Sequence, residues 1–285
     1  MAIERVGIVG SGIMGSGIAE VAAKAGATVV LRSRKQETAD AMVAGLDKSL
    51  AKQVSRGKLE EAEAEAVKAR VSGTADLEAL ADCDLVLESV VEDLAVKKQL
   101  FTELDRIVKD GAILATNTST LPVVEMAVET DRPERVVGIH FFNPAPAMSL
   151  VEVIRTLVSS DETVAEAVAF AETCGKGPVV VEDRAGFIVN ALLFPYLNNA
   201  VRMLENRTAS RDDIDAAMKG GCNFPMGPLA LLDLVGLDTS LAILDALYTE
   251  FRDPNYAAVP LLRRMVVAGH LGRKSGQGFY DYAKK

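Results

Sequence analysis

Val6-Gly7-Ile8-Val9-Gly10-Ser11-Gly12-Ile13-Met14-Gly15 is the stretch that decides the fold of this 285-residue chain. Its apolar first part predicts a buried strand, and the periodic residues Met14–Ala25 predict a helix directly after the turn. The glycines suit separate tasks: Gly10 permits a tight turn, Gly12 lets a ligand approach the backbone, and Gly15 lets the helix pack closely on the strand. A strand, a glycine turn and a helix in this order predict a site where the helix N-terminus holds the phosphates of a dinucleotide.

The two residues Ile13 and Met14 lie in the same turn, so we expect them to contact the cofactor together with the three glycines. A glycine pattern on its own is a weak signal. The alternative is a glycine-rich turn that binds nothing.

Strands and helices continue to alternate through the first part of the chain, which predicts a doubly wound α/β fold with helices on both faces of the sheet. A second helix is predicted at Val96–Ile107. From Glu37 to Arg70 the pattern is helical except around residues 55–58, which predicts two antiparallel helices forming an arm. The predicted strands are Arg5–Val9, Thr28–Leu31, Leu85–Leu87, Ile113–Ala115, Val136–Ile139, Leu150–Ile154 and Val179–Val181.

After Asp183 the strand pattern ends and helical segments separated by turn clusters follow. We therefore expect a dinucleotide-binding domain over residues 1–183, with the arm at about 37–70, and an all-α domain over residues 184–285. The apolar runs Leu229–Leu232 and Leu241–Leu247 exceed what one small domain is expected to hide, which favours dimerisation through the helical domain.

The overall charge argues against several classes of partner. A formal net charge of −9, from 40 acidic and 31 basic side chains, repels nucleic acid and acidic membrane surfaces. The three cysteines, Cys83, Cys174 and Cys222, are too far apart in the sequence for a disulfide framework or a metal site. The chain shows no signal peptide and no membrane-spanning run, so we expect a cytoplasmic protein without a metal.

The residues after the second predicted strand bear on the choice of dinucleotide. An NAD site usually carries an acidic side chain there, which binds the adenosine ribose. This chain has Arg32-Ser33-Arg34 instead. Two guanidinium groups around a small hydroxyl favour a 2′-phosphate, because arginine pairs with phosphate whereas a carboxylate would repel it. The sequence therefore favours NADP(H) over NAD(H); the alternative is that both arginines are simply solvated.

His140 follows a predicted strand at its carboxyl end, where open α/β sheets bind ligands. Imidazole is a natural proton acceptor for an alcohol because its ordinary pKa lies near neutrality. Glu152 is the charged residue within the apolar run Leu150–Ile154, and pairing with an imidazole would satisfy it. The alternatives are a histidine that belongs only to the core and a glutamate on a solvated strand face.

Six longer motifs carry a resemblance that spans nearly the whole chain: VGIVGSGIMGSGIAE, ATNTSTL, GIHFFNPAPAMSLVEVI, DRAGFIVNALLFPYLNNA, NFPMGPLALLDLVGLD and LGRKSGQGFYDY. In this order they resemble the 3-hydroxyacyl-CoA dehydrogenases, most closely the bacterial 3-hydroxybutyryl-CoA members. The chain departs from the family pattern at Ser33, where most members carry an acid.

The resemblance implies a role for individual residues. It makes His140 the catalytic acid/base and Glu152 its orienting carboxylate, with Ser119 and Asn190 holding the substrate oxygens. It places Glu92, Lys97, Asn117 and Asn143 at the nicotinamide end of the cofactor and Lys274 as a further cofactor contact. It places the CoA contacts on the arm, where Ser49, Lys52 and Arg56 are the candidates. The alternatives are that Ser119 only caps a turn, that Asn190 lies on an ordinary helix face, and that the arm residues are solvated.

The implied reaction interconverts a 3-hydroxyacyl-CoA, (S)-3-hydroxybutyryl-CoA by closeness to the butyryl members, and the 3-oxoacyl-CoA. Two other classes of protein share this architecture. A dehydrogenase of free hydroxy acids would use a lysine base and lack the arm. A non-catalytic dinucleotide-binding protein would have no reason to keep His140, Glu152, Ser119 and Asn190 together.

Overall fold

A computed structural model describes residues 3–283 of the chain. The chain divides into two compact units, the first ending at Asp183 and the second beginning at Arg184. None of the helices within the described residues is long and apolar enough to cross a bilayer.

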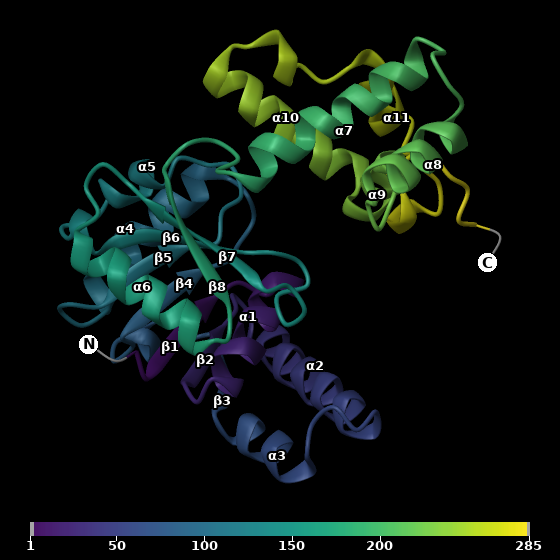
Figure 1. The fold of residues 1–285 in the computed structure, drawn as a ribbon. Helices are drawn as coiled ribbons and strands as arrows, with labels where there is room; N and C mark the ends of the chain where they lie inside the picture. The colour runs from purple at the N-terminus through teal and green to yellow at the C-terminus, as the bar shows by residue number, and fades with distance from the viewer. Residues whose placement is uncertain (1–2, 284–285) are drawn as a thin grey trace. The chain divides into compact units, whose positions relative to one another are not determined.

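The first unit is built on one eight-stranded sheet with the order β3-β2-β1-β4-β5-β6-β7-β8 (Figure 1). Every neighbouring pair is parallel except β6 and β7, which run antiparallel. The strand order reverses on either side of β1, and ligands of such sheets bind at that reversal. The strands are β1 (Arg5–Val9), β2 (Thr28–Arg32), β3 (Val71–Thr74), β4 (Leu85–Glu88), β5 (Ile113–Thr116), β6 (Val136–Phe141), β7 (Leu150–Arg155) and β8 (Gly177–Glu182).

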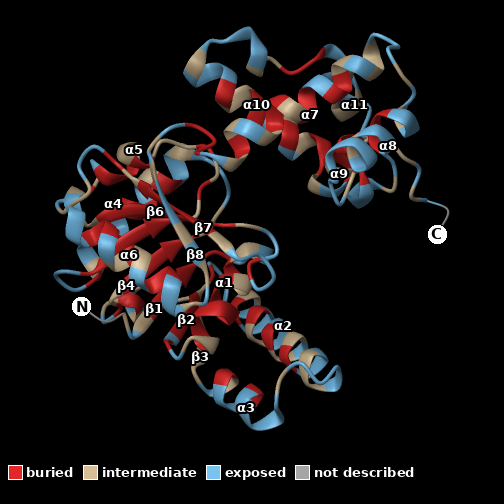
Figure 2. Ribbon diagram, in the orientation of Figure 1, coloured by how far each residue is buried: buried red, intermediate tan, exposed pale blue. Residues whose placement is uncertain are grey.

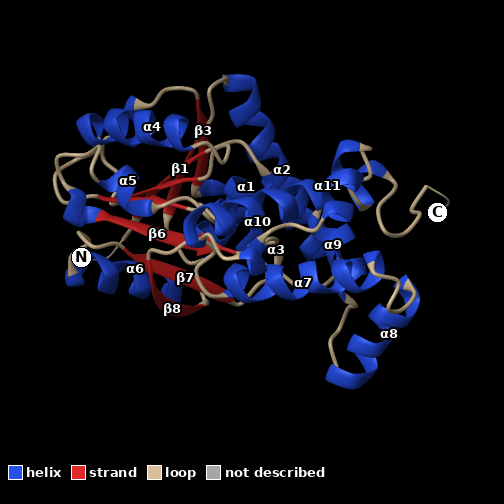
Figure 3. Cartoon of the chain, turned by 90° about the horizontal axis from the view of Figure 1, so that it is seen from above, coloured by secondary structure: helices blue, strands red, loops and turns tan. Residues whose placement is uncertain are grey.

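Helices cover both faces of this sheet, and Figure 3 shows α4 and α5 on the opposite side from α6. The core strands are buried almost completely (Figure 2), as expected for parallel strands covered on both faces. The elements between the strands are α1 (Ile13–Lys24), α2 (Gln36–Ser55), α3 (Glu61–Ala69), η1 (Glu78–Leu80), α4 (Leu94–Ile107), α5 (Val123–Ala127), η2 (Pro133–Arg135) and α6 (Asp161–Thr173). The predicted doubly wound fold is confirmed.

The arm consists of α2 and α3, which extend beyond the sheet in Figure 1. Its inner face joins the core that also contains α1, because Met42, Leu46 and Leu50 recur at helical spacing and are all buried there. Lys52, on the same helix, and Arg56, the C-cap residue that follows it, are both exposed. The arm is thus anchored by apolar packing and presents polar groups outward.

Two features of the sheet were not predicted. The short strand β3 adds an edge next to β2, and its sequence Val-Ser-Gly-Thr carries too few apolar residues to stand out. The antiparallel pairing of β6 and β7 has a simpler cause: residues 142–149 are too few for the crossover that a parallel pair requires.

The second unit is all helical apart from isolated bridges, within the residues that the structure describes. Ser210 is the N-cap of α8, since its hydroxyl accepts a hydrogen bond from the Asp213 N–H. The elements are α7 (Val189–Glu205), α8 (Arg211–Cys222), α9 (Pro228–Val235), α10 (Leu237–Phe251), η3 (Pro254–Tyr256), α11 (Pro260–Val267) and η4 (Arg273–Ser275).

The core of this unit corrects one expectation. Leu229, Leu232, Leu244 and Leu247 of the two apolar runs are buried inside the unit and do not form a surplus at its surface. The apolar side chains that do remain exposed include Leu192, on a different helix.

Candidate active site

His140 and Glu152 face each other directly across the antiparallel strands β6 and β7. His140 Nδ1 lies 2.8 Å from Glu152 Oε2, and both side chains are at most 5% exposed. The solvated-face alternative for Glu152 is therefore wrong. Because a carboxylate accepts hydrogen bonds, it selects the tautomer in which Nδ1 carries the proton and the lone pair is on Nε2.

The other ring nitrogen of His140 points to Ser119. Ser119 Oγ lies 3.1 Å from His140 Nε2, and the serine is in the turn after β5. The ring of Phe142 packs against the imidazole with 4.5 Å between ring centroids, which restricts its rotation. A carboxylate, an imidazole and a hydroxyl thus stand in line, the arrangement of a general base ready to act on an alcohol.

The glycine turn forms one wall of a cavity of about 670 Å³. Gly10 has φ +136°, and a Cβ at Gly10 would collide with the carbonyl oxygen of Ser89. Nothing lies within 4 Å of the Cβ position of Gly12, which leaves the helix N-terminus open to a ligand. The lining residues are Val9, Gly10, Ser11, Gly12, Arg32, Ser33, Arg34, Ser89, Val90, Val91, Val96, Gln99, Leu100 and Glu103.

Arg32, Ser33 and Arg34 all line this cavity. Arg32 Nε is buried and has no hydrogen-bond partner among residues 3–283. A buried donor without a partner is costly, so an anionic ligand at this end of the cavity fits the residues present. The open glycine turn and the unpaired arginine nitrogen together suit a phosphate-bearing dinucleotide.

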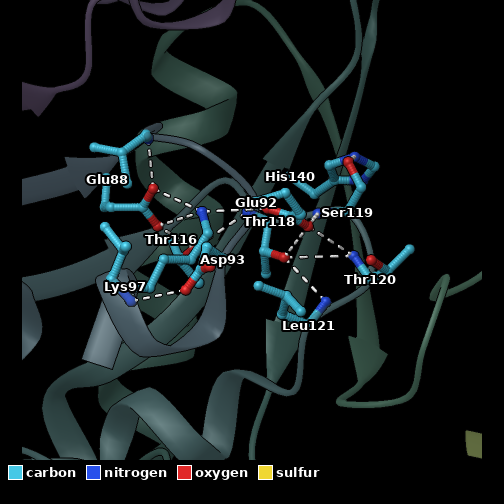
Figure 4. A network of polar contacts seen from close by, with 12 residues as sticks. Glu88, Glu92, Asp93, Lys97, Thr116, Thr118, Ser119, Thr120, Leu121 and His140 are labelled. Carbon is cyan, nitrogen blue, oxygen red and sulfur yellow. Dashed lines mark hydrogen bonds and ion pairs between the residues drawn. The ribbon is translucent and has the colours of Figure 1, made fainter. Parts of the chain in front are cut away.

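Glu92 and Lys97 lie in a network of polar contacts between β4, β5 and α4 (Figure 4). Lys97 is only 1% exposed, and its ammonium contacts both Glu88 and Glu92. Neither Glu92 nor Lys97 is among the residues that line the cavity. Asn117 accepts a hydrogen bond from the Phe141 N–H at 2.8 Å and so joins the ends of β5 and β6.

With this geometry in place, two family profiles account for almost the entire chain. The "3-hydroxyacyl-CoA dehydrogenase, NAD binding domain" matches residues 5–184, and the "3-hydroxyacyl-CoA dehydrogenase, C-terminal domain" matches residues 186–282. The chain belongs to the 3-hydroxyacyl-CoA dehydrogenase family. The cofactor is accordingly a nicotinamide dinucleotide.

Individual members of the 3-hydroxyacyl-CoA dehydrogenase family are similar over their full length. A 3-hydroxybutyryl-CoA dehydrogenase of Mycobacterium tuberculosis is 50% identical, covering 99% of both chains. One of Clostridioides difficile is 48% identical, covering 98% of this chain and 100% of the relative. The crystal structure of (S)-3-hydroxybutyryl-CoA dehydrogenase PaaH1 from Ralstonia eutropha superposes with a TM-score of 0.96 at 43% identity, covering 99% of this chain and 100% of that one.

On the arm, Ser49 donates a 2.8 Å hydrogen bond to Glu20 of α1, while Lys24 and Gln53 bind the same carboxylate. Burial alone would raise the pKa of Glu20, but these hydrogen bonds offset it and the pKa is lowered. Ser49 therefore helps to fix the arm to α1. Lys52 and Arg56 remain exposed, and the contact of all three predicted residues with CoA stays a prediction.

The remaining predicted residues are placed as follows. Asn143 is exposed just after β6, and Ile13 and Met14 begin α1. In the second unit, Asn190 is buried near the start of α7, and Lys274 in η4 forms a 2.6 Å ion pair with Asp238. Their roles toward cofactor or substrate stay predictions.

Glu88 and the two threonines that donate hydrogen bonds to Glu88 and Glu92 were not predicted from the sequence. Glu88 is the last residue of an apolar strand and His140 is next to last in another, so the same signal was available. Thr116 and Thr118 give no such signal, since threonine is common in strands and turns. Within the described part of the chain, no cluster of histidine, cysteine or acidic side chains is arranged to hold a metal ion.

Proposed function

We propose that the protein interconverts (S)-3-hydroxybutyryl-CoA and acetoacetyl-CoA by hydride transfer with a nicotinamide dinucleotide. The observation that carries this proposal is the buried His140, bound by Glu152 at Nδ1 and by Ser119 at Nε2. The names of the full-length relatives support the choice of substrate.

His140 Nε2 takes the proton of the substrate 3-hydroxyl as the C3–O bond becomes a carbonyl. When bound, the nicotinamide supplies the acceptor for the hydride that leaves C3. Glu152 stabilises the imidazolium that forms, and its burial at 1% exposure strengthens that interaction. In the reverse direction the imidazolium returns the proton to the oxygen.

Ser119 gives the reacting oxygen a hydrogen-bonding partner beside Nε2. Its backbone N–H donates to Glu92 Oε1 at 3.0 Å, which fixes the residue independently of its hydroxyl. A hydroxyl held in this way restricts the 3-oxygen to a position within reach of the base.

An assay at 340 nm with acetoacetyl-CoA tests the reaction, with NADPH and NADH compared at equal concentrations. Turnover by the wild-type protein and its loss in the matched His140→Gln variant are expected. No turnover of the wild-type protein with either nucleotide overturns the proposal, and turnover only with a free hydroxy acid would favour the other dehydrogenase class.

We infer that NADPH is preferred to NADH. Support comes from Arg32 and Arg34 at the cavity, the unpaired Arg32 Nε, and the absence of a carboxylate at position 33. Replacing Ser33→Asp is expected to shift the ratio of kcat/KM toward NADH by about 10- to 100-fold, the factor of one charge-assisted hydrogen bond.

Ser33→Ala is the matched control, since it removes the hydroxyl without adding charge and should shift that ratio far less. If the wild-type enzyme prefers NADH, the proposed site for the 2′-phosphate is wrong, whereas the proposed reaction is unaffected.

We further propose a cytoplasmic homodimer that associates through the second unit. Exposed apolar side chains there supply the surface that association would cover: Leu192, Met203, Phe224, Leu234 and Val267. Light scattering after size exclusion should give twice the chain mass, and Leu192→Glu should reduce it. A monomeric wild-type protein at micromolar concentration would contradict the dimer.

A further inference from the structure

The ion pair of Glu88 and Lys97 is buried almost completely, with side chains 0% and 1% exposed. Lys97 Nζ lies 2.6 Å from Glu88 Oε1 and 2.8 Å from Oε2. Taking two charges out of water is expensive, and well-packed apolar residues in their place are often as stable or more so. Stability alone therefore gives no reason for this pair.

Both carboxylate oxygens of Glu88 accept hydrogen bonds from neighbouring groups. Besides the ammonium, it accepts a 2.7 Å hydrogen bond from the Thr116 hydroxyl and a 2.5 Å bond from the Val90 N–H. Thr116 is its register partner on the neighbouring strand β5. This carboxylate is therefore held rigidly at the ends of two central strands.

Lys97 connects Glu88 to a second carboxylate, that of Glu92. Its ammonium also lies 3.3 Å from Glu92 Oε2, so it bridges the two glutamates. Unlike Glu88, the Glu92 side chain is 40% exposed. The ammonium therefore restrains the Oε2 end of a side chain that is partly open to water.

Glu92 in turn holds the backbone of the turn that contains Ser119. Its Oε1 accepts hydrogen bonds from the Thr118 hydroxyl at 2.5 Å, the Ser119 N–H at 3.0 Å and the Thr120 N–H at 3.3 Å (Figure 4). The hydroxyl of the same Ser119 lies 3.1 Å from His140 Nε2. One continuous set of contacts thus runs from the buried Glu88 to the base.

We propose that Glu88 and Lys97 are positioning residues: the buried pair locks Glu92, and Glu92 holds Ser119 against His140. The inference rests on the proposed function, because Ser119 matters only if His140 acts on an alcohol. Lys97 accordingly acts through Glu92, which its buried ammonium contacts at 3.3 Å.

The test is the double variant Glu88→Gln with Lys97→Met. A single replacement would leave an unpaired buried charge and destabilise the fold, whereas the double variant removes both charges at similar volume. The glutamine oxygen can still accept from the Val90 N–H, and its amide NH2 can donate to the Thr116 hydroxyl, so the main loss is the ammonium bridge to Glu92. Lys98→Met is the matched control, because Lys98 follows on the same helix but binds Glu125 and Glu129.

Three measurements are made on the full chain: thermal unfolding, hydrogen exchange of the Ser119 and Thr120 amides, and turnover of acetoacetyl-CoA. For the double variant we expect a near-normal melting temperature, faster exchange of both amides, and a kcat lower by about 10- to 100-fold. The KM for acetoacetyl-CoA should change by less than about threefold, because the loss concerns orientation and not binding.

Two outcomes separate the possible failures. A double variant with normal melting, normal amide exchange and normal kcat would show that the pair is only structural and overturn the inference. If the wild-type protein is inactive, the proposed function is wrong. The exchange of the Ser119 and Thr120 amides would still report whether the Glu88–Lys97 pair holds the turn that contains Ser119.

Discussion

Both units bury carboxylates, but they surround them with different donors. In the first unit, Glu152 faces an imidazole and Glu88 faces an ammonium. In the second unit, Asp215 accepts hydrogen bonds from the N–H groups of Leu229 and Ala230 at 2.8 and 3.0 Å. The first kind of partner can gain or lose a proton, whereas an amide cannot.

Asp233 repeats the second arrangement. It accepts hydrogen bonds from the N–H groups of Phe279 and Tyr280 and from the Tyr282 hydroxyl. The Tyr280 hydroxyl donates to Asp215, and burial together with that carboxylate raises the pKa of Tyr280, so the hydroxyl keeps its proton. These two aspartates fasten the C-terminal segment to α8 and α9. The comparison teaches that burial alone does not separate a carboxylate proposed to serve chemistry, such as Glu152, from one that serves architecture.

The largest effect on turnover is expected from replacing His140, the proposed base. His140→Gln should lower kcat by about 10³-fold, because glutamine keeps a polar side chain but cannot take a proton near neutral pH. Thermal unfolding should change little, since the loss is chemical. The assay at 340 nm and a melting curve measure the two effects, and a nearly normal rate would reject His140 as the base.

The next effect concerns the carboxylate that faces it. Glu152→Gln keeps the shape of the side chain but removes the charge that stabilises the imidazolium, so kcat should fall by about 10²- to 10³-fold. Steady-state kinetics measure this change. Turnover within a factor of two of wild type would show that Glu152 has only an architectural role, like Asp215 and Asp233, and would contradict the difference drawn between the two units.

In the second unit, the corresponding replacement of a carboxylate by an amide should lower stability instead of turnover. Asp215→Asn weakens the cap that Asp215 provides for α9 and turns an amide N–H toward other donors, at a cost of about 2 kcal/mol in the free energy of unfolding. Denaturation in urea measures it, and the folded enzyme should keep its turnover. The exposed Asp212→Asn is the control, with no measurable change expected; a large loss of kcat in Asp215→Asn at full stability would contradict the architectural role.

The smallest effect is expected at Glu20, which fastens the arm to α1. Its pKa is lowered below the ordinary value of 4.5, because the hydrogen bonds from Lys24, Gln53 and Ser49 outweigh the opposing effect of burial. The stability that it contributes is therefore present above pH 4.5 and is lost as the pH falls through the lowered pKa. The difference in unfolding free energy between wild type and Glu20→Gln should shrink below pH 4.5, and a difference independent of pH would contradict this assignment.

Much of the site was predictable because its signals are local. The glycine turn and the helix after it lie within one short stretch, and His140 and Glu152 are polar residues in apolar strands. Their pairing could also have been derived, because the short connection between β6 and β7 forces an antiparallel hairpin. The edge strand β3 was missed because its composition is weakly strand-like.

The sequence by itself determined the α/β fold and the glycine turn before the first helix, because strand and helix periods are properties of short segments, and its family resemblance made His140 the candidate base. Only the tertiary structure decided which carboxylate meets which donor. Glu88 meets Lys97 and Thr116, Glu92 meets the turn at Ser119, and Asp215 meets the start of α9. Such contacts depend on strand order and helix packing, and whether a buried charge is tolerable depends on the partner that the fold brings to it.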